Sequence, residues 1–382
     1  MKVESILKPH YMRVQEVIRD RILSGEWEPG EQIPTERELE KEFSLSRMTI
    51  SKGLANLVSE GFLLRRQGQG TFVALASTRE DAPRLIKYIS PLGRRGEIPV
   101  RYGVLEAMHD SVAASGYEIG IDFYGNADEQ TRFIKRDKDS YHSGFIIFFE
   151  PGETNLEELK RLKEDGYPFV LIDAYPYESD VDFAVTDNIE GGRIVVERLA
   201  QLGHQRISYV TRPIDRSSLS DRLSGFLKGL VMHDLPFTSD TVRKLVNPGN
   251  PALAEIGPVM DSFLDVPKPP TAIMFSNDDL ALEAMDYLYA RGIRIPEDIS
   301  IIGYDNIDRS STSRVRLTTV AQDFYEMARR ASEILLQKVE GRVGLCSVQS
   351  FIKPRLIVRD SVCSLSEPIS IETFMHDCSP VA

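Results

Sequence analysis

Cysteine is scarce in this chain, and it shows no arrangement suited to a metal site or a disulfide framework. Three cysteines occur among 382 residues, at Cys346, Cys363 and Cys378, and no two of them form a C-x-x-C pair. The six histidines are scattered, and none has the spacing of metal ligands. These scarcities argue against a zinc site and favour a reducing compartment, so we expect a cytoplasmic protein.

Long apolar runs are also missing. No run approaches the ~20 residues that a membrane-spanning helix needs, so no membrane partner is expected. The N-terminal stretch MKVESILKPHYMRV lacks the apolar segment of a secretory signal. The chain is nevertheless 42% hydrophobic, which is enough for real cores, and its length suits two or three domains.

Catalytic signatures are absent from the sequence as well. No Gly-x-Gly-x-x-Gly or Gly-x-Ser-x-Gly follows an expected strand, and no nucleophile has a partnered base in the sequence. We therefore expect no enzymatic activity and no cofactor.

The net charge of −12 is unevenly distributed along the chain. Residues 1–77 hold 11 basic and 11 acidic side chains, which leaves 35 basic and 47 acidic ones for the rest, out of totals of 46 and 58. Within the first segment the acids crowd into 26–42, and a group of basic residues follows them. A local excess of positive charge is what a DNA-binding surface needs, whatever the sign of the total.

The stretch 34–73 has the pattern of two short helices. Thr35 and Glu38 form the S/T-x-x-E capping box that begins a helix, which we expect to run to about Phe43. Ser46 is a good N-cap for a second helix. That second helix would place four apolar side chains on one face, namely Ile50, Leu54, Leu57 and Val58.

A hairpin is expected directly after these helices. Two β-prone runs, 62–66 and 71–73, flank the sequence Gln67-Gly68-Gln69-Gly70. A further helix over 10–24 carries an apolar stripe and is expected to pack beneath the other two. The segment therefore predicts a winged helix-turn-helix.

Side chains suited to DNA lie on the second helix and the hairpin. In such a domain the first turns of the second helix enter the major groove and meet base edges. Arginine and lysine suit phosphates and guanine edges, and threonine suits a phosphate or a thymine methyl group. The alternative is that these residues form only a solvated basic face. The residues that we expect to contact DNA are Arg37, Arg47, Thr49, Ser51, Lys52, Arg65, Arg66, Gln67, Gly68, Gln69 and Gly70.

A family resemblance covers residues 10–73 without a gap. It is carried by Tyr11, Ile18, Ile22 and the run Gly25-Glu26-Trp27-x-Pro29-Gly30-Glu31-x-Ile33-Pro34-Thr35-Glu36-Arg37-Glu38-Leu39. This pattern resembles the DNA-binding domain of GntR-type regulators, which implies sequence-specific binding to a double-stranded DNA operator. One position departs from the pattern: GntR-type domains often carry arginine where this chain has Ser51, so we expect a different operator.

From Leu85 onward, short Val/Ile-rich runs alternate with amphipathic helices. This alternation indicates parallel, doubly wound α/β sheets, and about 280 residues exceed what one sheet needs, so we expect two lobes. The predicted strands are 85–89, 118–124, 144–149, 168–173, 184–186, 207–211, 271–275, 299–303 and 318–320. The expected divisions of the chain are a headpiece 1–76, a linker 77–84, a sensor domain 85–362 and a tail 363–382.

Two helices of the sensor domain have recognisable ends in the sequence. One, near 100–115, has an apolar stripe and is followed by Gly116, a typical C-terminal stop. Another is predicted to begin at a second capping box, formed by Thr154 and Glu157.

Polar side chains recur where the predicted strands end. Ligands of doubly wound folds bind at the carboxyl ends of the strands, so the cleft between two lobes is the expected ligand site. Taken singly, Asp187, Asn277 and Asp278 fit helix N-caps equally well, and Arg222 fits a surface salt bridge. Their recurrence at equivalent strand ends favours a ligand site.

A second resemblance covers about residues 85–362. It is carried, in order, by Asp187-Asn188-x-x-Gly191-Gly192, Leu202-Gly203-His204-x-x-Ile207, Arg222-x-x-Gly225-Phe226, Asn277-Asp278-x-x-Ala281, Ile302-Gly303-Tyr304-Asp305-Asn306 and Leu317-Thr318-Thr319-Val320-x-Gln322-Asp323. These motifs resemble the inducer-binding domain of LacI-type repressors, which has the periplasmic binding protein-like type I fold.

This second resemblance implies a small effector, such as a sugar. It implies that Asp187, Arg222, Asn277 and Asp305 hold sugar hydroxyls, and that Asp173 and Gln322 make less constant contacts. Planar carboxylate, amide and guanidinium groups can each engage two neighbouring hydroxyls. Arg94 and Arg95 would favour an acidic sugar if they faced the cleft, or would lie in a solvated loop.

We therefore predict a homodimeric, ligand-responsive transcription regulator, and a repressor of carbohydrate-utilisation genes by resemblance. The alternatives are a GntR-headed fusion with a cofactor-dependent catalytic α/β domain, and a binding protein without a DNA function. The catalytic alternative would need a longer chain and a lysine in a cofactor-binding context. The predicted DNA-binding headpiece argues against a binding protein without a DNA function.

Overall fold

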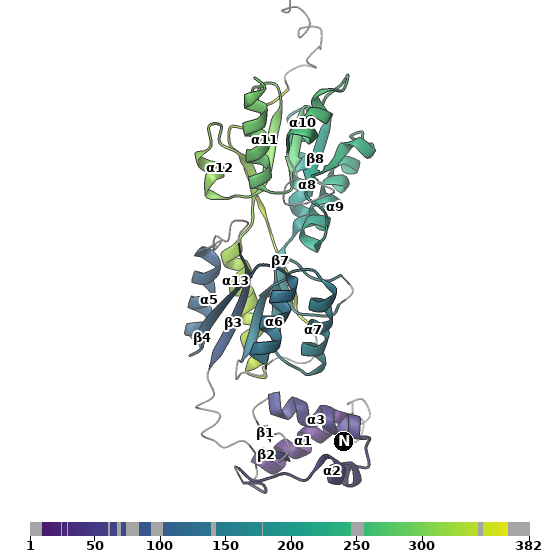
Figure 1. Ribbon diagram of the computed structural model, residues 1–382, viewed down its shortest axis with the longest axis vertical. Helices are drawn as coiled ribbons and strands as arrows, with labels where there is room; N and C mark the ends of the chain where they lie inside the picture. Colours follow the sequence, from purple (N-terminus) through teal and green to yellow (C-terminus); the bar gives the residue numbers. More distant parts are fainter. Residues whose placement is uncertain are drawn as a thin grey trace, which may run out of the picture. The chain divides into compact units, whose positions relative to one another are not determined.

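The computed structural model describes residues 10–23, 25–28, 30–59, 62–66, 70–73, 84–92, 102–138, 143–177, 179–245, 256–342 and 347–365. Its contacts divide the chain into two compact units, Met1–Ala184 with Phe324–Ser350 and Val185–Asp323 with Phe351–Ala382. The first unit contains the headpiece and an α/β lobe, called the first lobe below. The second unit is a second α/β lobe (Figure 1). The chain therefore passes from one unit to the other three times.

The headpiece is a three-helix domain with a two-stranded antiparallel hairpin, as the sequence predicted. Its core is formed by apolar residues of all five elements, among them Val14, Ile18, Leu39, Ile50 and Leu57. Gln32 adds an isolated antiparallel bridge to Phe72 of the hairpin. The elements are α1 (His10–Leu23), α2 (Glu36–Phe43), α3 (Arg47–Ser59), β1 (Leu63–Arg66) and β2 (Gly70–Val73).

The two helix starts of the headpiece follow from their capping residues. The side chain of Thr35 accepts a hydrogen bond from the Glu38 amide, and the Glu38 carboxylate accepts one from the Thr35 amide, which completes the predicted capping box. Ser44 has φ 53, so the chain turns sharply between α2 and α3. Ser46 accepts a hydrogen bond from the amide of Thr49 at the start of α3.

The first lobe is built on a six-stranded sheet in the order β13-β7-β6-β5-β3-β4. The pairs from β4 across to β7 are parallel. Helix α13 arrives from far along the chain and packs on α5, β5 and β6. The elements are β3 (Leu85–Pro91), α5 (Tyr102–Ala113), β4 (Glu118–Tyr124), α6 (Ala127–Lys138), β5 (Gly144–Phe148), α7 (Glu153–Glu164), β6 (Phe169–Ile172), β7 (Phe183–Thr186), α13 (Phe324–Val339) and β13 (Gln349–Ile352).

The second lobe repeats this plan in a six-stranded sheet with the order β14-β12-β11-β10-β8-β9. Its strands are parallel except for β14, which is antiparallel to β12. The elements are α8 (Asn188–Gln201), β8 (Ile207–Thr211), α9 (Ser217–Met232), η2 (Ser239–Thr241), β9 (Val242–Lys244), α10 (Ile256–Leu264), β10 (Ala272–Phe275), α11 (Asp278–Ala290), β11 (Ser300–Asp305), α12 (Asp308–Thr312), β12 (Thr318–Ala321) and β14 (Arg355–Ile357).

Each sheet has a point where the strand order reverses. In the first lobe β4 lies on one side of β3 and β5 on the other, and in the second lobe β9 and β10 flank β8 in the same way. Such switch points open a crevice at the carboxyl ends of the strands, where ligands of this architecture bind. In the second lobe, the segments that follow β8, β10 and β11 are therefore the place to look for a site.

All nine predicted strands of the lobes are present, with ends shifted by at most a few residues, but β9, β13 and β14 were not predicted. The second predicted capping box is wrong. Helix α7 begins at Glu153 with Gly152 as its N-cap and no side-chain cap, so Thr154 lies inside the first turn. The Thr154 hydroxyl instead approaches Asp128 and Thr131 of α6.

Several sequence-based expectations fall on residues outside the described ranges. They include Gln67, Gly68 and Gln69 of the hairpin, most of the linker, Arg94 and Arg95, and nearly all of the tail. The four domain boundaries consequently stay a prediction. In the ranges given above, no helix is both long and apolar enough to cross a bilayer.

Candidate functional site

The recognition helix α3 presents its first turns outward. The side chain of Arg47 is 79% exposed and Lys52 is exposed, whereas Thr49 and Ser51 are half-buried. The Thr49 hydroxyl lies 2.9 Å from that of its capping neighbour Ser46, which fixes its direction. The four side chains of α3 that we expect to contact DNA therefore lie in the first two turns of one helix.

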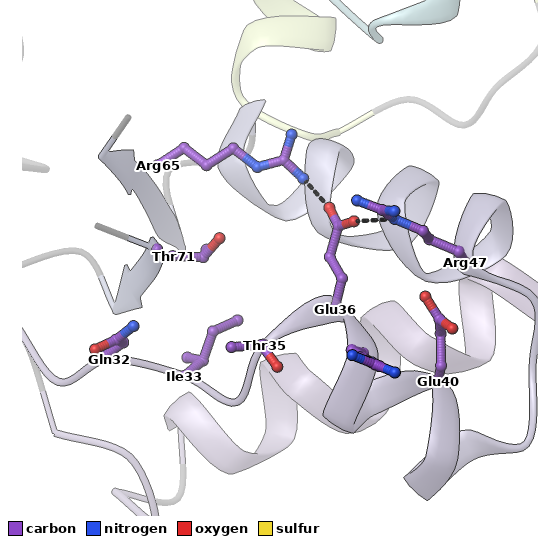
Figure 2. A pocket seen from close by; sticks show the side chains of 10 residues that line it. Gln32, Ile33, Thr35, Glu36, Glu40, Arg47, Arg65 and Thr71 are labelled. Carbon is purple, nitrogen blue, oxygen red and sulfur yellow. Dashed lines mark hydrogen bonds and ion pairs between the residues drawn. The ribbon is translucent and has the colours of Figure 1, made fainter. Parts of the chain in front are cut away.

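Glu36 lies between the two arginines that were expected to contact DNA (Figure 2). It is the first residue of α2, and its carboxylate is 3.3 Å from Nε of Arg47 and 2.5 Å from a terminal nitrogen of Arg65. The pairs are partly exposed, so they contribute little to stability. What they do is hold an arginine of the recognition helix and one of the hairpin toward each other.

This arrangement closes one side of a hollow of about 800 Å³ between α2, α3 and the hairpin (Figure 2). Its lining residues are Gln32, Ile33, Thr35, Glu36, Arg37, Glu40, Arg47, Arg65, Gly70 and Thr71. Sequence reasoning named Arg37, Arg47, Arg65 and Gly70 from this group and missed Glu36. The available signal was the acidic residue at the first position of a helix that precedes the recognition helix.

The hairpin requires glycine at one of its predicted contact positions. Gly70 has φ +121, and an added Cβ would collide with the side-chain amide of Gln32. Arg66 lies opposite Gly70 in the register of β1 and β2. Gln67, Gly68 and Gln69, which were also predicted to contact DNA, lie outside the described residues.

Lys52 has a partner within the headpiece. Its ammonium nitrogen lies 4.6 Å from the ring centroid of Tyr11 in α1, so the aromatic face directs the lysine along the outer side of α3. The charge remains exposed to solvent. A directed, exposed ammonium group suits a phosphate contact.

Arg222 is the centre of the polar group in the second lobe. It lies on α9, only 4% exposed, and donates from Nε to Oδ1 of Asn188 at 2.8 Å and from a terminal nitrogen to the carbonyl of Ser276 at 2.6 Å. Its guanidinium carbon is 3.8 Å from the ring centroid of Tyr304. A surface salt bridge, the alternative for this residue, is therefore excluded.

Asp305 and Gln322 complete a connected set with Arg222. Nε2 of Gln322 donates to Oδ1 of Asp305 at 2.6 Å, and Oε1 of Gln322 accepts from the hydroxyl of Thr186 at 2.7 Å. Asp305 has φ 108, a strained backbone conformation that positions its carboxylate at the end of β11. Three of the six predicted ligand residues are thus brought together in one lobe.

Two other predicted ligand residues act as helix N-caps, which was their alternative. Oδ1 of Asp187 accepts from the amide of Glu190 at 2.9 Å, and Oδ1 of Asn277 accepts from the amide of Leu280 at 2.9 Å. Capping occupies one oxygen of each side chain in these contacts. The sixth residue, Asp173, belongs to the first unit, where it follows β6 with φ 70 and is buried.

Asp278 is a buried carboxyl group beside this set; sequence reasoning weighed it as a helix cap or a ligand group and did not include it among the expected ligand contacts. Its oxygens accept from the Ile307 amide at 3.0 Å and from the hydroxyls of Ser310 and Thr319 at 2.6 Å each. Burial, with the nearby charge of Asp305, raises the pKa of Asp278 to about 7 against these hydrogen bonds. The carboxyl group holds the loop that follows β11.

Glycines bring the helices of the second lobe close together around Arg222. A Cβ on Gly225 of α9 would collide with the carbonyl oxygen of Ile189, and one on Gly192 of α8 would lie 2.6 Å from the amide nitrogen of Phe226. Only glycine permits this approach. The glycines of the motifs are therefore structural, and they set the distance from Asn188 to Arg222.

Within the described part of the chain, no three histidine, cysteine, aspartate or glutamate side chains gather closely enough to hold a metal ion. The polar group of the second lobe instead offers planar hydrogen-bonding groups. Such groups can hydrogen-bond to the hydroxyls of a polar ligand.

Two protein families match parts of the chain. The bacterial regulatory proteins of the gntR family match residues 10–73, and a periplasmic binding protein-like domain matches residues 196–362. The first match covers the headpiece and the second covers most of the second lobe. Both resemblances predicted from the sequence are thereby confirmed.

Relatives match the chain over nearly its whole length. The arabinose metabolism transcriptional repressor of Geobacillus stearothermophilus is 30% identical in an alignment 378 residues long, which covers 92% of this chain and 97% of the relative. The repressor of the same name from Halalkalibacterium halodurans is 30% identical in an alignment 386 residues long, which covers 93% of this chain and 97% of that relative.

Solved structures share the fold. A complex of the transcriptional regulator CelR with cellobiose has a TM-score of 0.65 at 20% identity, and the match covers 93% of this chain and all of that one. The lac repressor dimer bound to operator and the anti-inducer ONPF has a TM-score of 0.62 at 20% identity, covering 75% and 96%. These likenesses confirm two doubly wound lobes of the LacI type.

Proposed function

Because this chain belongs to the family of transcriptional repressors that join a GntR-type headpiece to a LacI-type sensor domain, we propose that a small neutral sugar releases it from its operator. The proposed sugar site lies at the carboxyl ends of the strands of the second lobe. Asp173 of the first lobe stays among the proposed ligand contacts, as the second resemblance implied.

The observation that carries this proposal is the set formed by Arg222, Asp305 and Gln322, of which Arg222 and Gln322 are buried. A guanidinium, a carboxylate and an amide lie together, each held by further partners, and Asp305 and Gln322 stand at the carboxyl ends of β11 and β12. Planar groups of alternating donor and acceptor character match the paired hydroxyls of a sugar. Because the arginine charge is opposed by Asp305, a neutral ligand is favoured over an anionic one.

We further propose that the protein acts as a homodimer on a palindromic operator, in the cytoplasm. One recognition helix reads too few bases to specify a site, and two-fold symmetry in the protein is matched by symmetry in the DNA. Closure of two lobes on a ligand can change the spacing of the two headpieces. The DNA contacts are proposed to be those predicted from the sequence, with Glu36 orienting Arg47 and Arg65.

The chain is proposed to work by binding alone, without catalysis or a cofactor. Its relatives are named as transcriptional repressors, and Arg222, a buried charged group of the sensor, is held by structural hydrogen bonds. Both relatives are named for arabinose metabolism, and arabinose is a pentose. Pentoses are therefore the first sugars to test.

Titration calorimetry of the full chain against neutral pentoses, hexoses, uronic acids and sugar phosphates tests the effector. Operator fragments are then selected from random duplexes, and the affinity of the protein for them is measured with and without the sugar that binds. Sugar should weaken operator binding, and operator should weaken sugar binding by the same factor, because the coupling is reciprocal. A ligand confined to acidic sugars, or one that leaves operator affinity unchanged, would contradict the proposal.

A further inference from the structure

Met48 is an anomaly on the surface of the headpiece. It is 81% exposed, and among the described residues 10–73 it is the one large hydrophobic side chain that reaches this level of exposure. Fifteen other apolar side chains there enter the core or pack against it. The headpiece thus completes its own core and leaves one long apolar group outside.

The position of Met48 on α3 identifies the surface to which it belongs. Ile50, Leu54 and Leu57 of this helix are buried in the core. At 3.6 residues per turn, Met48 lies on the opposite side of the helix, on a line with Lys52 and Ala55. Its immediate neighbour in sequence, Arg47, is also exposed.

The chemistry around Met48 argues for DNA as its partner. Exposed cations precede it at Arg47 and follow it one turn later at Lys52, so the surface that covers this side of α3 must be anionic. In the major groove, which the start of a recognition helix enters, the apolar group that base edges offer is the C5-methyl of thymine. A protein partner would have to bury an apolar side chain between two exposed cations.

We propose that Met48 contacts the C5-methyl group of a thymine in each operator half-site and so makes this repressor select thymine at that position. The unbranched, polarisable methionine side chain adapts to the methyl surface. Ala55, two turns farther along the same side of α3, is small and leaves the helix room to approach the groove. This inference rests on operator binding by the headpiece and deepens it by naming one base and one atom.

The test removes the methyl group from the DNA and the thioether from the protein in separate steps. An operator is first selected from random duplexes with the full-length wild-type protein, and each of its thymines is then replaced by deoxyuridine. Uracil pairs like thymine but lacks the methyl group. Burial of one methyl-sized group is worth about 0.8 kcal/mol, or about fourfold in affinity, so one uracil in each of the two half-sites should weaken wild-type binding about 15-fold.

The same series of duplexes is then measured with Met48→Ala and Met48→Leu. Met48→Ala should bind the all-thymine operator about as weakly as the wild type binds the sensitive uracil duplex, and uracil should cause no further loss. Met48→Leu should retain sensitivity at that thymine. Because the side chain is exposed, circular dichroism and melting temperature should match the wild type.

Lys52→Ala is the matched control from the same side of α3. It should weaken binding to all duplexes alike and leave the uracil penalty intact. An unchanged uracil penalty in Met48→Ala, or no penalty at any thymine with the wild type, overturns the inference. A dimer that dissociates more readily in Met48→Ala, with no uracil effect, would assign the side chain to a protein contact and also overturn it. If no sequence is selected at all, DNA binding by the headpiece fails instead.

Discussion

Arg222 and Asp305 face each other in the second lobe with 3.6 Å between a terminal guanidinium nitrogen and Oδ1, which is longer than a hydrogen bond. Each is held by a separate partner: Arg222 by Asn188 and Asp305 by Gln322. The two charges are thus fixed opposite each other without being tightly joined. A ligand hydroxyl can bridge this loosely spaced ion pair without first breaking a hydrogen bond between its two members, which lowers the cost of binding.

Arg222→Ala should abolish the response to effector and leave operator binding intact. The change removes hydrogen bonds to a buried polar ligand, so sugar affinity should fall by about 2 kcal/mol or more. Calorimetry with the cognate sugar and reporter expression in cells measure this, and the expected phenotype is uninducible repression. Arg316→Ala is the control, because Arg316 pairs with Asp360 on the exposed surface of the same lobe. Wild-type sugar affinity in Arg222→Ala would show that the ligand binds elsewhere.

Glu36→Gln should reduce the selectivity of the headpiece for its operator over other DNA. Removing the carboxylate frees Arg47 and Arg65 and removes a negative charge from a surface that meets phosphates. Non-specific affinity should therefore rise, and its salt dependence should steepen. Competition binding with operator and random duplexes measures the ratio of operator affinity to non-specific affinity.

Glu40→Gln serves as the comparison for this prediction, since Glu40 lines the same hollow. It should raise non-specific affinity by a similar electrostatic effect but retain the orientation of the two arginines. If both variants lose selectivity equally, charge alone is responsible and the bridging role of Glu36 is wrong.

Asp278 should make the stability of the second lobe fall as pH rises from about 4 to about 7. Burial raises the pKa of Asp278 from 3.8 to about 7, so the native lobe holds a proton that the unfolded chain has released. The proton stabilises the native state at low pH, and this contribution is lost at about 1.4 kcal/mol per pH unit within that window. The free energy of unfolding, measured with urea at several pH values, should change less steeply with pH in Asp278→Asn than in the wild type.

Asp279→Asn is the neighbouring control, because the side chain of Asp279 is 67% exposed. Its slope should equal that of the wild type. A wild-type slope in Asp278→Asn would mean that the carboxyl group stays ionised throughout, held by its three donors.

Gly225→Ala should unfold or strongly destabilise the second lobe, by about 3 kcal/mol or more, because the new methyl group collides with backbone of α8 that cannot move alone. Gly103→Ala in α5 is the contrast: its added Cβ would meet Tyr325 at 3.6 Å, an ordinary contact. Alanine favours a helix by up to about 1 kcal/mol over glycine, so this variant should be neutral or more stable. Thermal unfolding separates the two outcomes, and equal losses would contradict the assignment.

The regular elements were predictable because local patterns determine them. Strand β8 was predicted with its observed ends, because Ile207–Thr211 is a short run rich in β-branched and aromatic residues. The capping box at Thr35 was likewise readable from spacing. Thr154 and Glu157 carry the same pattern without forming a cap, because Gly152 begins the helix earlier and the Thr154 hydroxyl has partners in α6.

The site was only partly predictable because its key contacts join residues far apart in the sequence. No local pattern shows that Gln322 reaches Asp305, or that Arg222 is buried beside Asn188. Glu36 was missed for a related reason: among many acids its charge looked like part of a solvated face. The unpredicted strands β13 and β14 are short and carry few buried side chains, so their sequences lack a strong period.

The three passages of the chain between the units impose an order on synthesis. The sheet of the first lobe is covered by α13 (Phe324–Val339), which leaves the ribosome only after β7 through β12 have been made. The second lobe in turn waits for β14 (Arg355–Ile357), which borders its sheet. A nascent chain therefore presents its headpiece while both lobes are still incomplete, and chaperones have their longest opportunity to bind during that interval.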